Sequence, residues 1–261
     1  MMRTLLLRGM LAGLIAGLLA FGFAKLVGEP AVDRAIDFES YVEHHSHHEA
    51  ADDEPVSRSV QGSAGLGVGA VLFGVAVGGI FALVFALAYG RLGPRTVRGT
   101  AAVLGLLAFV SISLVPVLRY PANPPSIGNS DTIGRRTALY LLMILLSVTA
   151  VVIAVVVRRR LVPRFGEWDA TLLAAGGYVV AMVLCYVLLP GINEVPQEAI
   201  RGVVRAVGDA HVTFPPTVLW RFRIASLGVQ AVVWTTIAIA FSALARPHLE
   251  PSPTELASSN P

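Results

Sequence analysis

Six apolar stretches of about 20 residues each constrain this chain more than any other feature. A helix needs about 20 apolar residues to cross about 30 Å of hydrocarbon, and its backbone groups must be hydrogen-bonded within the segment. The pattern predicts an all-α, polytopic integral membrane helix bundle with about six transmembrane helices, forming a single membrane domain over residues 1–261. The expected spans are Leu5–Val27, Ala64–Tyr89, Thr100–Leu118, Ala138–Val157, Ala170–Leu189 and Phe222–Leu244.

Composition agrees with a chain that faces lipid. The 261 residues are 55% hydrophobic and only 14% charged, whereas a soluble domain carries about 25% charged residues. The net charge of +3 is explained by arginines beside the spans, so we expect the lipid bilayer and no nucleic acid as a partner. The single cysteine, Cys185, allows neither an internal disulfide nor a CxxC motif.

The first span has two interpretations. Arg3, Arg8 and the small-residue triplet Ala20-Phe21-Gly22 resemble a cleaved signal peptide covering residues 1–22. A retained span is favoured because the apolar run is long and because Gly9, Gly13 and Gly17 recur every four residues. The remaining spans keep their orientation in either case.

Glycine spacing also predicts how the first two spans pack. The second span contains Gly65-x-x-x-Gly69 and Gly74-x-x-x-Gly78, and such faces let two helix backbones approach closely. We expect tight packing of spans one and two. A pore lined by exposed backbone is the alternative.

Arginine-rich short links predict the orientation, because such links stay in the cytoplasm. Arg91, Arg95 and Arg98 flank the link after span two, and four arginines between 158 and 164 follow span four. Both links, both termini and a disordered tail over 246–261 are therefore predicted to be cytoplasmic. Seven arginines fall on the other side, but we give more weight to the short links.

The segment 28–61 is then an extracytoplasmic loop rich in histidine and acid. It contains "YVEHHSHHEAADDE", in which four of the chain's six histidines fall within five positions, and it holds nine carboxylates against two arginines. Neutral imidazoles bind divalent transition metals, and clustered carboxylates raise the local cation concentration. Whether the tract is helical or disordered, we predict metal capture. The candidate ligands are His44, His45, His47, His48, Glu43, Glu39 and Glu49, with tentative additions Glu194, Glu198 and His211.

The membrane interior and the motif content exclude several functions. The middles of the six spans contain no Asp, Glu, Lys, Arg or His, and their few polar residues, such as Ser111, Ser147 and Cys185, are typical of helix packing. The chain has no phosphate-binding loop, no HExxH and no GxSxG. We therefore expect no enzyme, no catalytic residue and no tightly bound cofactor. After span five, residues 198–209 have the apolar spacing of a short amphipathic surface helix.

Several phrases of the chain resemble the CbtA family of proposed bacterial cobalt transporter subunits. Besides the first loop, the resemblance rests on Tyr120–Pro125, Thr132–Thr137, Asn193–Pro196, Phe214-Pro215, Leu219–Arg223, Ser226–Gly228 and Gln230. The resemblance covers nearly the whole chain. It implies a multi-pass protein of the bacterial inner (cytoplasmic) membrane that works with a small histidine-bearing CbtB subunit in cobalt uptake for cobalamin synthesis.

Two functions remain open. The first is a membrane subunit of an uptake transporter for a divalent transition metal, with cobalt favoured, whose external loop captures the ion. The second is a membrane protein that binds metal or assists assembly without transport, for which nickel, zinc or copper would also fit. The charge-free helix interiors favour the second, and the family resemblance favours the first.

Overall fold

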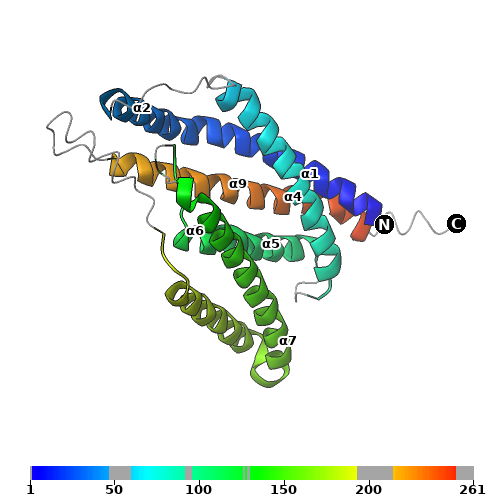
Figure 1. The fold of residues 1–261 in the computed structure, drawn as a ribbon. Helices are drawn as coiled ribbons and strands as arrows, with labels where there is room; N and C mark the ends of the chain where they lie inside the picture. Colours follow the sequence, from blue (N-terminus) through cyan, green and yellow to red (C-terminus); the bar gives the residue numbers. More distant parts are fainter. Residues whose placement is uncertain are drawn as a thin grey trace. The chain divides into compact units, whose positions relative to one another are not determined.

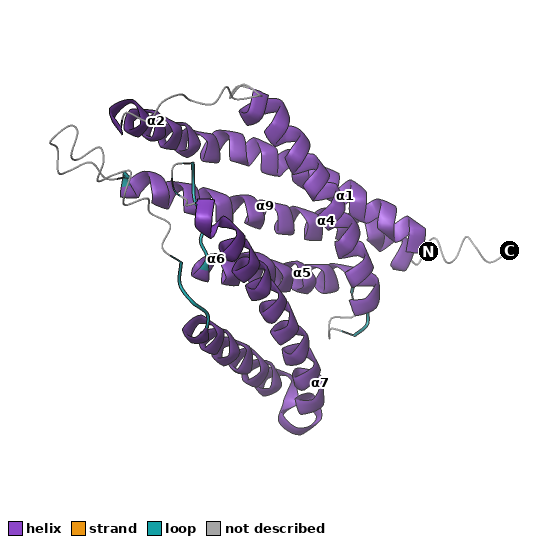
Figure 2. Ribbon diagram, viewed as in Figure 1, coloured by secondary structure: helices purple, strands orange, loops and turns teal. Residues whose placement is uncertain are grey.

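The structure is a computed structural model that describes residues 2–46, 60–91, 96–125, 127, 130–192 and 214–250, and these residues contain helices and no strand (Figure 2). The α-helices are α1 (Met2–Phe23), α2 (Glu29–Ser46), α4 (Leu66–Ala88), α5 (Val97–Ala108), α6 (Val115–Arg119), α7 (Ser130–Leu188) and α9 (Pro216–Leu249). Three short π-helices are η1 (Ala24–Gly28), η2 (Gln61–Gly65) and η3 (Phe109–Leu114).

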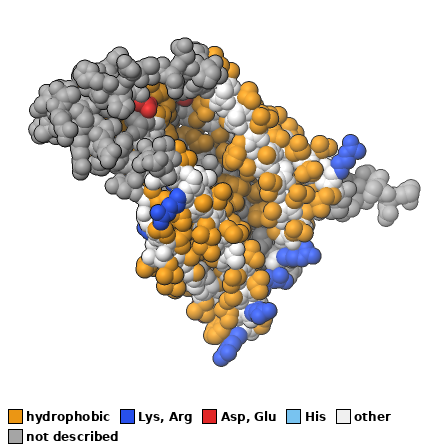
Figure 3. All heavy atoms as spheres, in the orientation of Figure 1, with side chains coloured by type: hydrophobic (Ala, Val, Ile, Leu, Met, Phe, Trp, Pro, Cys, Tyr) orange, Lys and Arg blue, Asp and Glu red, His pale blue; other side chains and the backbone are white. Residues whose placement is uncertain are grey.

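Five helical segments of the described residues are long and apolar enough to cross a membrane: Met2–Tyr41, Gly62–Ala88, Val97–Arg119, Thr132–Leu188 and Pro216–Leu249. The longest of them turns back at Gly166, so the all-α prediction is confirmed and the expected count of about six agrees with the structure. Hydrophobic side chains also dominate the described part of the face drawn in Figure 3. The chain is therefore a multi-pass membrane protein.

The helices differ from the expected spans at their ends. The segment predicted as a loop from Gly28 continues from α1 through η1 into α2 and is helical as far as Ser46. At the other end, α9 continues to Leu249, past the start of the predicted tail, whose residues 251–261 lie outside the described residues. The predicted amphipathic helix at 198–209 also lies outside them.

The chain forms two compact units. The first contains Met1–Phe23, Arg58–Val110 and Gly228–Pro261, and the second contains Ala24–Ser57 and Ser111–Leu227. The helix α9 contributes its first part to the second unit and the rest to the first.

In the first unit, α1 and α4 form an antiparallel pair held by glycine (Figure 1). A Cβ atom added to Gly13 would overlap the carbonyl oxygen of Gly74, and one added to Gly9 would overlap that of Gly78. Such overlap means that the two backbones are in direct contact, as in other small-x-x-x-small interfaces of membrane helices. The predicted packing of spans one and two is confirmed, and at these positions the glycines face the partner helix instead of a pore.

The rest of the first unit joins α5 and α9 to this pair. A Cβ added to Gly105 of α5 would lie 2.9 Å from the Cβ of Ala238 of α9. The Phe241 ring of α9 meets the rings of Phe81 and Phe85 edge to face, with centroids 5.5 and 4.8 Å away. These contacts bury Phe85 and Phe241 completely.

Three polar contacts of the first unit lie near helix ends. The Glu250 carboxylate accepts a 2.7 Å hydrogen bond from the backbone N–H of Val97, at the N-terminus of α5, where a negative charge is favoured by the helix dipole. Burial and the Glu250 carboxylate raise the pKa of Tyr89, just after α4. Arg8 of α1 and His248 of α9 are also hydrogen-bonded, at 2.8 Å.

In the second unit, α7 forms a helical hairpin (Figure 1). The Ser147 and Tyr178 hydroxyls share a 2.8 Å hydrogen bond, although 31 residues of straight helix would separate their backbones by about 46 Å. The reversal occurs at Gly166, whose φ of 79° and ψ of 172° are essentially restricted to glycine. This turn converts α7 into the fourth and fifth predicted spans.

Candidate metal site

The first half of the predicted capture tract lies on α2. The backbones of Glu39, Glu43, His44 and His45 are helical and belong to its last two turns. His47, His48, Glu49, Glu194, Glu198 and His211 lie outside the described residues. Among the residues that the structure describes, no three or more His, Cys, Asp or Glu side chains come together as a metal site. The ligand set therefore stays a prediction.

An apolar face fixes α2 within the second unit. Ala35 of α2 belongs to a buried cluster with Ile127, Phe214 and Val218, and Phe38 packs against the cluster. The Phe38 and Phe214 rings meet edge to face with centroids 5.2 Å apart. The residues that lead into the histidines thus belong to a helix anchored on the start of α9.

Exposed carboxylates follow another side of α2. Asp33 and Asp37 are four residues apart and both are exposed, so they share a face directed away from the buried cluster. The backbone of His44 lies seven residues, or about two turns, beyond Asp37. An acidic helix that ends in a run of histidines can concentrate divalent cations where imidazoles can bind them.

Arginines and a tyrosine of the second unit connect the end of α6 to other helix ends. Arg119 donates to the carbonyl of Leu189, just after α7, and the Tyr120 hydroxyl donates to the carbonyl of Pro190 at 2.9 Å. Arg136 donates to the carbonyl of Pro121. Arg223 of α9 donates to the carbonyl of Ala122 at 3.3 Å and to Oδ1 of Asn123 at 3.1 Å. The guanidiniums therefore satisfy carbonyls that no helix pairs.

Among the described residues, two tyrosines of the second arm of α7 make polar contacts that sequence reasoning missed. Tyr178 pairs with Ser147, and the Tyr186 hydroxyl donates to the backbone carbonyl of Val115 at the start of α6. Tyrosines usually gather at the membrane surface, so the position of Tyr178 in the middle of a span was an available signal, whereas Tyr186 lies near the end of its span. Neither contact contains a metal-binding carboxylate or imidazole.

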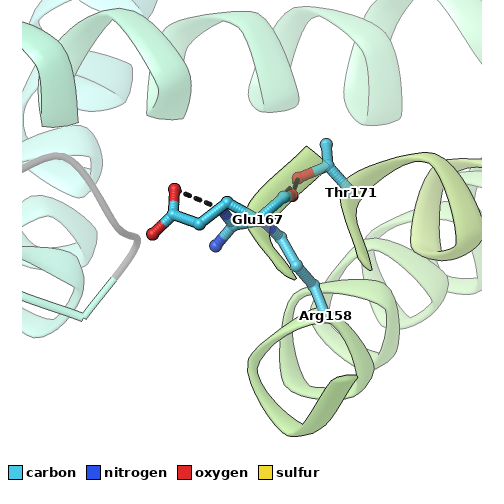
Figure 4. Close-up of polar contacts among 3 residues, drawn as sticks. All are labelled: Arg158, Glu167 and Thr171. Atoms are coloured by element: carbon cyan, nitrogen blue, oxygen red, sulfur yellow. Dashed lines mark hydrogen bonds and ion pairs between the residues drawn. The ribbon is translucent and has the colours of Figure 1, made fainter. Parts of the chain in front are cut away.

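The arginine-rich link after the fourth span contains its own ion pair. Arg158 donates to the Thr171 hydroxyl at 2.8 Å and approaches the Glu167 carboxylate at 3.4 Å (Figure 4). Thr171 in turn donates to the Glu167 carbonyl. These contacts connect the two arms of α7 at the turn, which fits a polar hairpin tip outside the hydrocarbon region.

Comparison with protein families gives one match. The family described as "Probable cobalt transporter subunit (CbtA)" matches residues 2–246, which is nearly the whole chain. The chain belongs to the CbtA family. Comparisons with curated proteins and with solved structures give no match.

CbtA-family membership makes this chain a membrane subunit related to cobalt transport, as the resemblance predicted. The phrases that carried the resemblance have a structural role where they are described. In the Tyr120–Pro125 phrase, the Tyr120 hydroxyl donates a hydrogen bond to the carbonyl of Pro190. Arg223, from the Leu219–Arg223 phrase, donates to the carbonyl of Ala122 and to Oδ1 of Asn123. These phrases therefore stabilise the fold, and they do not form a set of metal ligands within the described residues.

Proposed function

We propose that this CbtA-family protein is the membrane subunit of an uptake transporter for a divalent transition metal, with cobalt favoured. In this proposal the histidines and carboxylates at and beyond the end of α2 face outward and capture the ion. The match to the CbtA family over residues 2–246 is the observation that carries the proposal. The acidic helix leading into the four histidines supports the capture step.

The ligand chemistry explains why capture and selection are separate tasks. Imidazole and carboxylate ligands bind cobalt more weakly than nickel or copper, following the usual affinity order. A flexible or helical histidine tract would therefore collect several metals. Selection for cobalt must come from other parts of the transporter or from metal supply.

Replacing His44, His45, His47 and His48 together with Ala tests the capture step. We expect cobalt accumulation in cells to fall several-fold at limiting cobalt and to change little at plentiful cobalt, because a weaker capture site matters only when the ion is scarce. Histidine has an ordinary pKa of about 6.5, so wild-type accumulation should also weaken below about pH 6.

His248→Ala is the matched control, because it removes a histidine from α9 outside the tract. Protein amounts in the membrane are compared by immunoblot for all variants. Equal uptake by the fourfold variant and the wild type at limiting cobalt would exclude the capture role. A parallel loss in His248→Ala would point to general instability.

The outward orientation needs its own test. Cys185 is the only cysteine, so Cys185→Ser gives a background in which Ser46→Cys is the single thiol. We expect a membrane-impermeant maleimide to label that thiol in intact cells. Labelling only after the cells are broken would place the tract in the cytoplasm and exclude capture from outside.

A second candidate is a membrane protein that binds metal or assists assembly without conducting it. The observation that favours it is the lack of charged residues in the middles of the spans, since intramembrane charges commonly mark ion paths. Cobalt influx into vesicles that contain this chain, with and without a CbtB-like small subunit, separates the candidates. No influx in either case, together with retained cobalt binding, would favour the second.

A further inference from the structure

A groove of about 240 Å³ lies between the start of α2 and the start of α9, within the second unit. Val27, Pro30, Ala31 and Arg34 line one side, and Trp220, Arg221, Ile224 and Ala225 line the other. The lining is mostly apolar, and its only charged residues are Arg34 and Arg221. Neither the predicted metal ligands nor the helix-end contacts of Arg223 involve this groove.

The groove has a closed floor and an open mouth. Ala31 and Ala225 are buried, with 2% and 3% of their surfaces exposed. Val27, Ile224 and Trp220 are exposed by 47%, 49% and 65%. Small residues at the floor let the helices approach, and the larger residues above them leave a space that opens outward.

The residues of the groove lie at the ends of two apolar segments, which places the groove at the level of the membrane surface. The groove begins at Val27, the last residue of the first apolar run of the sequence, and it reaches the first turns of the apolar helix α9. Exposed tryptophan at the end of a span is typical of the level of lipid headgroups. Apolar side chains in the same lining then face the adjoining hydrocarbon.

The two arginines of the groove have no partner in the part of the chain that the structure describes. Within the described residues, neither Arg34 nor Arg221 has a hydrogen bond or an ion pair. Arg223, two residues further along α9, binds Ala122 and Asn123 instead. The carboxylates of α2 at Glu29 and Asp33 do not line the groove. The lining therefore carries two positive charges and no negative one.

We propose that this groove binds an anionic phospholipid, whose phosphate contacts Arg34 and Arg221 and whose acyl chain follows Val27 and Ile224. Guanidiniums bind phosphate oxygens in a bidentate geometry, and basic pockets beside membrane helices bind anionic headgroups. The volume accommodates part of a lipid, while its chains remain in the bilayer. The proposal does not depend on the metal that the protein handles.

Lipid exchange measured by native mass spectrometry tests the proposal on the full chain. The protein is purified in detergent and titrated with phosphatidylglycerol or phosphatidylcholine. We expect the wild type to bind phosphatidylglycerol at least about tenfold more tightly, and the double variant Arg34→Gln/Arg221→Gln to bind the two lipids equally. Arg98→Gln removes an exposed arginine of α5 and should behave like the wild type.

Equal binding of the two lipids by the wild type would overturn the proposal. An unchanged preference for phosphatidylglycerol in the double variant would also overturn it. The same holds if the wild type co-purifies with a protein, and not a lipid, that is lost from the double variant. Circular dichroism in the same detergent checks that the variants remain folded.

A second measurement does not require the arginine variants. The chain has three tryptophans, so Trp168→Phe/Trp234→Phe leaves Trp220 as the only one. We expect phosphatidylglycerol with brominated acyl chains to quench the fluorescence of Trp220 at several-fold lower mole fractions than brominated phosphatidylcholine does. Quenching at equal mole fractions would mean that the groove does not select an anionic lipid.

Discussion

The α1–α4 pair and the two arms of α7 are both antiparallel pairs of apolar helices, but different contacts hold them together. In the α1–α4 pair, Gly9, Gly13, Gly74 and Gly78 bring the two backbones into contact. In α7, by contrast, a Cβ added to Gly176 or Gly177 would meet no atom within 4 Å.

The arms of α7 are instead connected by side chains, through Ser147 with Tyr178 and through Arg158 with Thr171 and Glu167. In lipid, close backbone contact and interhelical hydrogen bonds are two separate means of association. The comparison teaches that glycine in an apolar helix does not by itself identify a packing face, since Gly176 and Gly177 touch no neighbouring helix. Each pair should therefore respond to a different kind of substitution.

The largest effect is expected for Gly13→Leu. Its side chain would overlap the backbone of Gly74, so the helices must separate, at a cost of about 3 kcal/mol or more in the free energy of unfolding. Denaturant titration in mixed micelles measures this. Gly22→Leu is the matched control in the same helix, because no atom lies within 4 Å of a Cβ there, and it should change stability by about 0.5 kcal/mol or less. Similar losses for both variants would refute the backbone-contact model.

A smaller loss is expected for Gly166→Ala, where the need for glycine comes from the backbone angle instead of from a neighbour. At φ 79° and ψ 172° an alanine is strained, and the cost should be about 1–3 kcal/mol. Gly177→Ala in the second arm should instead be neutral or stabilising by up to about 1 kcal/mol, because alanine favours helix. Equal stability of the two variants would mean that the turn tolerates other conformations.

The hydrogen bond between Ser147 and Tyr178 should contribute less. A double-mutant cycle of Ser147→Ala and Tyr178→Phe is expected to give a coupling of about 0.6 kcal/mol, the typical value for side-chain hydrogen bonds between membrane helices. Stability in bicelles gives the four required values. A coupling free energy of zero would mean that this hydrogen bond does not stabilise the hairpin, and the proposed difference between α7 and the α1–α4 pair would lose its main support.

The smallest effect is expected at the tip of the hairpin. Glu167→Gln removes the ion pair with Arg158, but the Glu167 side chain is 79% exposed, so the loss should be about 0.3 kcal/mol and should vanish at high salt. Unfolding at low and at 1 M salt checks this. A loss that persists at 1 M salt would show that the contact is more than a screened surface pair.

Much of the fold could be predicted from the sequence because the relevant signals are local or periodic. Apolar length gave the spans, and the four-residue spacing of Gly9, Gly13 and Gly17 gave the face that packs against α4. The π-helix η3 and the pairing of Tyr178 with Ser147 could not be predicted in this way. The pairing depends on which helices become neighbours, and a tyrosine within an apolar run indicates a polar contact without indicating its partner.

The candidate site was predicted only as a tract. Residue type indicates metal affinity for the histidines, but a ligand set requires several side chains to converge, which spacing alone does not determine. The segment from Gly28 was predicted as a loop, and a helix was left open only for the tract around the histidines, so the start of α2 at Glu29 was not foreseen. Ala31, Ala35 and Phe38 carry the helical spacing that could have predicted it.

The turn at Gly166 has a consequence for biogenesis. Because the arms of α7 are joined by so few residues, neither can leave the translocon far from the other, and the two would enter the lipid as one unit. The arginines at 158, 159, 160 and 164 would hold its tip on the side of synthesis. If synthesis stopped after the first arm, the Ser147 hydroxyl would lie in the membrane without the Tyr178 hydroxyl that binds it in the complete hairpin.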